Sequence, residues 1–222
     1  MLFKATSLLL LVQTLAPVHA QVAPPKSLQT AREVLISALK AKLAARSYRC
    51  KVVLSSGAGG AELDRVTEIE YVAPDNYRTS LKSMTNGKST EAEMIIRGTD
   101  GYVRTTDKPW QKVSVNKKEL ESFRSNDETL LNNLEKTTDD AVVLSGKEML
   151  DGLSMYVCQH QFNGAPGLAA RSRTRTWVGV EDGLPYKTEL VAWTKYNGTG
   201  FTITTITTYR DFNTEIKIAL PL

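Results

Sequence analysis

The residues of this chain that could perform catalysis are few and scattered. Beyond the first twenty residues there is one histidine, His160, which shares its strand phase with Tyr156 and Cys158. A lone histidine in a strand is more often a packed or surface residue than a catalytic base. Ser145 and the following glycine lack the flanking pattern of a nucleophile elbow. The sequence therefore predicts no catalytic residues, and a hydrolase is the least favoured of the functions considered.

The two cysteines, Cys50 and Cys158, both fall in predicted strands. There is no CxxC pair and almost no histidine, so neither a metal site nor a redox motif is indicated, and no cofactor is expected. Both cysteines have the phase of their apolar neighbours and should face the interior. In an exported protein this predicts a disulfide between them. The alternative is two buried thiols that never meet.

Charged and glycine-rich segments carry little functional signal. The glycine-rich stretch 57–60 lies between two predicted strands, so it indicates a hairpin and not a phosphate-binding loop. Arg171, Arg173 and Arg175 alternate along one strand face, where they could meet anionic headgroups or a partner protein. A solvated face that resists aggregation is the favoured interpretation. The net charge of +4 is spread along the chain, which argues against a nucleic-acid partner.

A larger set of residues suits the binding of an apolar ligand. Along the predicted strands, apolar side chains alternate with polar ones, and such residues share one face of a sheet. An apolar ligand needs an apolar trough with few polar groups. The candidates for its lining are Tyr48, Val52, Leu54, Ile69, Tyr71, Leu81, Met94 and Ile96. The alternative is that they pack against a helix as a closed core.

The elements that must position these residues follow from periodicity and turn signals. An apolar stripe predicts a helix over residues 27–45, capped by Ser27, and six short strands follow over residues 48–115. Lys117–Lys136 has helical spacing, with a break between two short helices expected at Asn126-Asp127. Five more strands follow from residue 141, the last three forming a meander from Arg171 to the end of the chain.

The first twenty residues have the composition of a secretory signal peptide. Lys4 precedes an apolar run over residues 8–12, and Val18-His19-Ala20 resembles the small-residue pattern of a cleavage site, with cleavage expected before Gln21. A membrane anchor is less favoured, because the apolar run is shorter than the ~20 residues that a span requires. No cysteine follows the cleavage site for lipid attachment. We expect residues 21–222 to form one domain outside the inner membrane.

The order of helix, six strands, helical insert and five strands resembles the LolA/LolB-like lipoprotein-carrier superfamily. The motifs that carry the resemblance are Pro74-Asp75-Asn76-Tyr77-Arg78, Asp100-Gly101 with Trp110, Trp177-Val178 with the segment DGLPYK at 182–187, and Tyr209-Arg210-Asp211-Phe212. The resemblance covers nearly all of residues 27–222. It implies a mainly β fold: an unclosed antiparallel barrel of about eleven strands, with an N-terminal helix and a helical lid on the concave face.

The resemblance also implies a function. Members of this superfamily, which includes periplasmic lipid carriers and the sensor domain of RseB, hold acyl chains on the concave face. By this resemblance the chain is a periplasmic monomer that carries lipid or lipoprotein acyl chains towards the outer membrane, with membrane export and acceptor proteins as partners. Its lid residues would be Leu120, Phe123, Leu130 and Leu134. The alternative is a non-enzymatic sensor or envelope-assembly protein that binds a lipidated partner.

Overall fold

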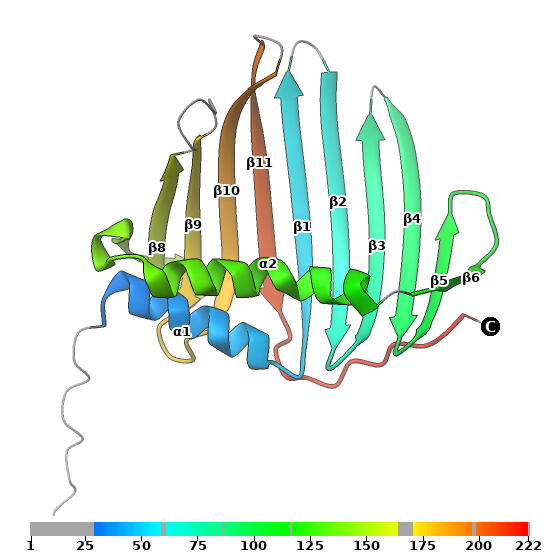
Figure 1. Ribbon diagram of the computed structural model, residues 1–222, viewed down its shortest axis with the longest axis horizontal. Helices are drawn as coiled ribbons and strands as arrows, with labels where there is room; N and C mark the ends of the chain where they lie inside the picture. The colour runs from blue at the N-terminus through cyan, green and yellow to red at the C-terminus, as the bar shows by residue number, and fades with distance from the viewer. Residues whose placement is uncertain are drawn as a thin grey trace, which may run out of the picture.

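The described strands form one antiparallel sheet that is not closed into a barrel (Figure 1). The computed structural model describes residues 29–58, 61–85, 87–115, 117–163, 171–196 and 199–221. The expected signal peptide, residues 1–20, lies outside the described residues. The mainly β fold class with two helices, expected from the sequence, is confirmed.

Eleven strands are present in the described part of the chain, and they divide into six and five as the sequence predicted. Their order across the sheet is β6-β5-β4-β3-β2-β1-β11-β10-β9-β8-β7, so the pairing of β1 with β11 joins the two halves. Their bounds are β1 (Ser47–Ala58), β2 (Ala61–Val72), β3 (Asn76–Thr85), β4 (Lys88–Arg97), β5 (Asp100–Thr105), β6 (Gln111–Ser114), β7 (Val142–Leu150), β8 (Leu153–Asn163), β9 (Arg171–Gly179), β10 (Pro185–Tyr196) and β11 (Thr199–Arg210).

The hairpin signals in the sequence mark real turns. Gly87, between β3 and β4, has a φ of 75°, and Asp151 and Gly152, between β7 and β8, have φ values of 51° and 81°. Two successive positive φ values are what a tight type I′ hairpin requires. These turns fix the register of the strands that they join.

The first helix, α1 (Ala31–Ala44), begins later than predicted. Its N-cap is Thr30, whose side chain accepts a hydrogen bond from the backbone N–H of Glu33, while the Glu33 carboxylate accepts one from the backbone N–H of Thr30. This reciprocal capping box satisfies two donors that would otherwise lack partners, so the helix starts there. The prediction that Ser27 caps the helix was wrong.

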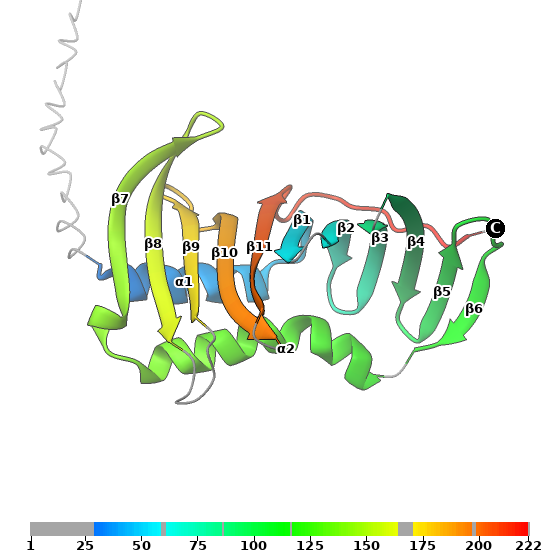
Figure 2. The same cartoon turned by 90° about the horizontal axis from the view of Figure 1, so that it is seen from above.

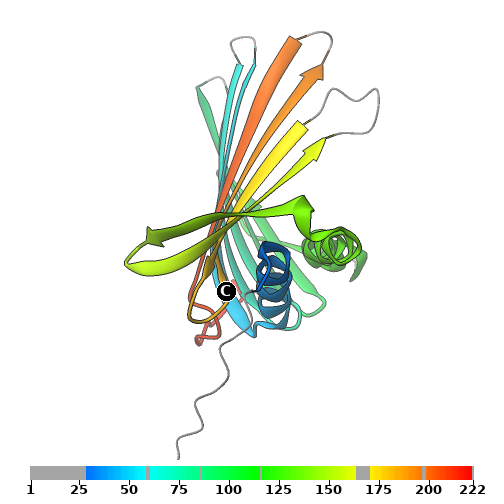
Figure 3. The same ribbon diagram turned by 90° about the vertical axis from the view of Figure 1, so that its left-hand side faces the viewer.

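The second helix, α2 (Lys117–Lys136), is continuous, so the break predicted at Asn126-Asp127 was also wrong. Asn and Asp cost a helix only about 0.7 kcal/mol per residue at most. A tertiary ion pair of Asp127 with α1 favours the helical arrangement. Both helices lie on the same face of the sheet, and the strands β1–β4 and β10–β11 extend well beyond them (Figures 1 and 3). A short 3₁₀ turn, η1 (Asp139–Ala141), leads from α2 to β7.

The main core lies between α1, the end of α2 and strands β7–β9. Leu35 and Ala38 of α1 are almost fully buried there, beside Leu134 of α2, Cys158 of β8 and Val178 of β9. Because the sheet lies under both helices here, this cluster fixes α1 and the end of α2 to one half of the concave face.

A separate cluster occupies the opposite, convex face. Met155 and Val157 have the other strand phase from Cys158, and they are fully buried with Trp177. Leu150, near the end of β7, packs against them. The hairpin of β7 and β8 bends away from the helices (Figures 2 and 3), and a register shift in β7 between Leu144 and Gly146 accompanies the bend.

The chain after β11 is not a strand, although the sequence predicted a meander to the end. Asp211 and Asn213 have φ values of 56° and 59°, which no strand accommodates. The segment runs along one end of the sheet (Figure 1). There the backbone N–H of Asn213 donates to the carbonyl of Ser47 at 2.9 Å, and the N–H of Arg46 donates to the Asn213 side chain at 2.8 Å.

We expect Leu35→Ala to lower the free energy of unfolding by about 2–5 kcal/mol, since the Leu35 side chain is 1% exposed and its loss leaves a cavity. The same change at Leu144, which is 43% exposed, should cost about 1 kcal/mol or less. Urea unfolding of both variants measures the difference. Equal losses would contradict the placement of α1 over the core.

Candidate functional site

The eight residues predicted to line a trough all lie on one face of the sheet. Across β1, β2 and β4 the first row, at the end near the helices, contains Tyr48, Tyr71 and Ile96, with Tyr77 of β3, which was not among the eight, between the last two. The others follow in the same phase: Val52 and Leu54 on β1, Ile69 on β2, Leu81 on β3 and Met94 on β4. This is the face that carries both helices.

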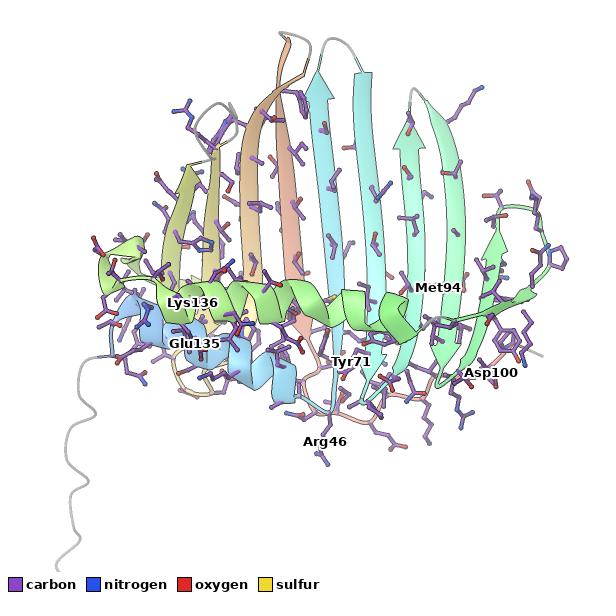
Figure 4. The ribbon with its side chains drawn as sticks, viewed as in Figure 1. Arg46, Tyr71, Met94, Asp100, Glu135 and Lys136 are labelled. Carbon is purple, nitrogen blue, oxygen red and sulfur yellow. The ribbon has the colours of Figure 1, made fainter. Side chains whose placement is uncertain are left out.

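The row nearest the helices is a filled core. Tyr71, Tyr77 and Ile96 are 4%, 3% and 2% exposed, and they form one cluster with partly buried neighbours that include Met94. Figure 4 shows Tyr71 near the end of the sheet that the helices cover, and Met94 at the level of α2. In the structure these three residues are therefore packed in a closed core.

Farther along the strands the concave face has no helix over it among the described residues (Figure 1). We use the term trough for the partly exposed residues of this zone: Val52, Leu54, Thr67, Leu81, Leu190 and Thr205. Val52 faces Thr67, which faces Leu81, and Leu54 faces Thr205, which faces Leu190. The surface thus combines aliphatic side chains with threonine methyl and hydroxyl groups, and the exposed Arg65 of β2 faces Leu54 at its edge.

Half of this trough was missed from the sequence. Leu190 and Thr205 belong to β10 and β11, whose β-branched composition predicted strands but not their position beside β1. The pairing of the first strand with the last is a contact between distant parts of the chain. The same two-residue alternation that identified Leu54 would have found them once that pairing was known.

The predicted lid residues divide into two groups. Leu134 is 4% exposed within the main core, and Leu130 packs against that core, so both attach α2 to α1. Leu120 and Phe123 lie in the first half of α2, and the positions of their side chains are outside the described part of the structure.

A charged side chain lies between the helices and the sheet. Lys42, near the end of α1, is 8% exposed, and its Nζ lies 2.7 Å from Oδ2 of Asp127 on α2. The same ammonium donates a hydrogen bond of 3.0 Å to the hydroxyl of Tyr209 on β11 and lies 4.6 Å from the centre of that ring. One cation therefore connects both helices to the sheet.

The surroundings keep this ammonium charged. Burial alone would lower the pKa of Lys42. Its interactions with Tyr209, Asp127 and Tyr48 raise the pKa by more than burial lowers it, so the net pKa lies above the ordinary value. Burial also raises the pKa values of Tyr48 and Tyr209 above their usual range. At neutral pH the group is thus an ammonium beside two neutral phenols.

A cavity of about 80 Å³ lies beside this ion pair, between α1, α2 and the sheet. Lys42, Asp127 and Tyr209 form its polar part together with hydroxyl side chains of β9 and β10, including Thr188. Leu35, Leu39 and Leu130 are among the apolar residues of its wall. A buried ion pair and several hydroxyl groups therefore lie at the helix-covered end of the concave face.

Lys42 was missed from the sequence, although a signal was present. It follows Ala38 by four residues and Leu39 by three, so it falls on the buried stripe of α1. A lysine at such a position usually extends its stem along the apolar surface and its ammonium to water. Here the ammonium meets Asp127 instead, and only the fold brings that residue close.

The predicted disulfide is absent: Cys50 and Cys158 are both free and buried. Strands β11, β10 and β9 separate β1 from β8, which puts the two cysteines about 19 Å apart along the sheet. A disulfide needs Cα atoms within about 7 Å. Cys158 donates a weak hydrogen bond to the carbonyl of Ala31, at the opposite end of α1 from Lys42. The expectation that both cysteines face inward was right, and the pairing was wrong.

The other polar candidates form no catalytic group. His160 lies on the concave face opposite Thr174, and burial lowers its pKa. Its Nδ1 has no hydrogen-bond partner within the described residues, so no acid orients it. Nor do the described residues contain a group of three or more His, Cys, Asp or Glu side chains that could hold a metal ion.

The convex face has a different chemistry. A pocket of about 580 Å³ lies over β1–β3 and β11, and many of its lining residues are charged, among them Lys51, Glu68 and Arg210. Arg49 there pairs with Glu70 at 2.8 Å and with Asp211 at 2.9 Å. Such a surface suits water or a polar partner and not an acyl chain.

Comparisons with known proteins identify the fold. No family model matches the chain, and no curated protein matches its sequence. Among solved structures, LprF from Mycobacterium bovis superposes with a TM-score of 0.52 at 12% identity, covering 86% of this chain and 96% of that one. The chain thus has a LolA/LolB-like fold, as the sequence predicted. At this identity the likeness is one of fold.

Two further structures are similar over comparable lengths of this chain. A LolA superfamily protein from Nitrosomonas europaea has a TM-score of 0.33 at 14% identity, with 87% of this chain and 96% of that one covered. The MucA/MucB complex of Pseudomonas aeruginosa has a TM-score of 0.38 at 14% identity, with 83% of this chain and 56% of that chain covered.

In the described part of this chain, neither helix is long and apolar enough to cross a bilayer.

We expect both thiols to react slowly with iodoacetamide in the folded protein at neutral pH, because burial raises the pKa of each to about 11. Both should react fully in denaturant without a reducing agent. Intact mass spectrometry counts the alkyl groups added. A denatured, unreduced protein that adds none, with a mass two protons lower, would show a disulfide in solution.

Proposed function

We propose that this protein binds acyl chains of lipids or lipoproteins in the trough and carries them between membranes. The observation that supports this is the row of partly exposed aliphatic side chains, Val52, Leu54, Leu81 and Leu190, on a sheet face without a helix over it. A soluble protein gains nothing from leaving such a face in water. An acyl chain laid on it gains about 0.8 kcal/mol for each methylene that it buries.

The chemistry of the trough fits a ligand without strong polar features. Its hydroxyl groups belong to threonines such as Thr67 and Thr205, which also expose methyl groups. Apolar contacts discriminate weakly between chains that differ by a methylene. A carrier built this way accepts acyl chains of several lengths, and selects its cargo at the head group or through partner proteins.

The second helix is proposed as a lid that is attached at one end. The second half of α2 is held on α1 by Leu134 and by the ion pair of Lys40 with Glu135 at 2.8 Å. Its first half, which contains Leu120 and Phe123, runs along the concave side of the sheet (Figure 2). We propose that α2 up to Asp127 moves away when an acyl chain enters, while the part from Leu130 onwards, which packs on the main core, stays in place.

The compartment and the partners belong to the same proposal. Residues 1–20 would be a signal peptide, and residues 21–222 a single, monomeric domain in the periplasm. Transport towards the outer membrane would need an export complex that loads the protein and an acceptor that unloads it. No enzymatic step is part of this function, since the protein only shields its cargo from water.

We expect Leu54→Glu to weaken the binding of a fluorescent fatty-acyl probe by about 10-fold or more, because a carboxylate in the trough loses its hydration when the chain binds. The matched control is Val53→Glu, at the preceding residue of the same strand, whose side chain is on the convex face. Both positions are partly buried. Probe titration and urea unfolding of the two variants separate binding from stability.

The control variant should bind the probe like the wild type. If the two variants bind equally well, or if the wild type binds no acyl probe, the acyl-chain function is wrong. A probe that binds only when a second, lipidated protein is present would instead favour the sensor alternative.

A further inference from the structure

The buried pair of Lys42 and Asp127 is more than a link between two helices. Lys42 is on α1, near the junction with β1, whereas Asp127 is on α2, the proposed lid. Asp127 is the more exposed partner, with 23% of its side chain accessible against 9% for Lys42. The cation is therefore fixed in the interior, and its counter-ion is carried by the element that is proposed to move.

The pair lies at the end of the trough. Tyr209, which accepts the hydrogen bond from Lys42, is opposite Cys50 in the register of β11 and β1. Two residues farther along come Val52 and Thr207, and then Leu54 and Thr205. From the level of the ammonium, an extended chain can thus follow the concave face of β1 and β11 for about 20 Å before it reaches the far end of β1.

We infer that Lys42 binds the anionic head group of a single-chain amphiphile, a fatty-acid carboxylate, which replaces Asp127 while the acyl chain lies in the trough. The inference rests on the proposed function and adds to it the class of head group and the trigger for the lid. The cavity beside the pair provides the space, and hydroxyl groups of Tyr209 and Thr188 can donate to the incoming carboxylate.

An exchange of partners suits this site better than a simple release of the lid. Removing one partner of a buried ion pair is strongly destabilising, because the other charge is left without compensation. When a carboxylate of the ligand takes the place of the Asp127 carboxylate, Lys42 stays paired. Asp127 then leaves with α2 and is hydrated. The cost of opening the lid is therefore low only for an anionic ligand.

The remaining contacts of α2 explain why the exchange would move only one end of the helix. Arg32 donates hydrogen bonds to the carbonyl groups of Leu134 and Glu135 at 2.8 and 3.1 Å, and Lys40 pairs with Glu135. These contacts lie at the end of α2 and do not involve Asp127. They hold the helix to α1 when the pair with Lys42 is broken.

The test compares dodecanoate with dodecanol, which share a chain and differ in charge, on the full chain at neutral pH. We expect the wild type to prefer dodecanoate by about 10-fold or more, as charge-assisted hydrogen bonds contribute. Lys42→Met should remove the preference and keep dodecanol binding. Asp127→Asn should strengthen dodecanoate binding. Lys40→Met is the matched control, since it removes an ion pair between the same helices at an exposed position.

Hydrogen exchange of α2 gives a second measurement. Dodecanoate should speed exchange in the first half of α2 in the wild type, and dodecanol should do so much less. Acetate and inorganic phosphate, as anions without a chain, should have no such effect. If either of them opens α2 as dodecanoate does, the site takes free anions and the amphiphile is wrong.

The outcomes distinguish the two proposals. Equal binding of dodecanoate and dodecanol by the wild type, or a preference that survives in Lys42→Met, overturns the head-group site and leaves the acyl-chain function intact. Binding of neither ligand overturns both. If Lys42→Met does not fold, Asp127→Asn decides, since an unchanged affinity for dodecanoate in that variant rules out the exchange.

Discussion

The structure depends on a sheet whose concave face is only partly covered. A curved sheet with an apolar face gains from burying that face. The two helices lie across the strands, and each is about 10 Å wide, so they cannot cover strands of up to 12 residues, which are about 40 Å long. Near the helices, Tyr71, Tyr77 and Ile96 close a core. Farther along, Val52, Leu54 and Leu81 stay partly exposed. The buried core under the helices therefore contributes more to folding stability than the partly exposed trough does.

The position of Lys42 follows from the same constraint. The helices meet the sheet at the boundary between the filled core and the open trough, where a purely apolar contact would hold the lid closed. A buried ion pair contributes little net stability, because desolvation offsets most of its attraction. In the proposed exchange its value at this boundary is specificity, since the strength of the contact would depend on which group carries the negative charge. Tyr209 and Tyr48, as neutral phenols, support the ammonium without competing for that role.

The features that could be predicted from the sequence are those determined by local interactions. Two-residue alternation and turn glycines such as Gly87 and Gly152 specify strands and hairpins, so the strand number and the face of Leu54 or Leu81 followed directly. What failed depends on contacts between distant residues. The continuity of α2 reflects the pair of Asp127 with Lys42, and the free state of Cys50 and Cys158 reflects the three strands between them. The trough residues of β10 and β11 required the pairing of β1 with β11.

The two faces of the sheet differ in chemical character. On the convex face of β3–β5, Glu93 pairs with Arg78 and Arg104, and its hydrogen bond with Arg104 holds the pKa of Glu93 below the ordinary value. Such networks keep a sheet face hydrated and resist pairing with other chains. The concave face of the same strands carries Leu81 and Met94 in the alternate positions. Because strand alternation lets a sequence choose the character of each face independently, an apolar ligand can be received on one side while the other side stays in water.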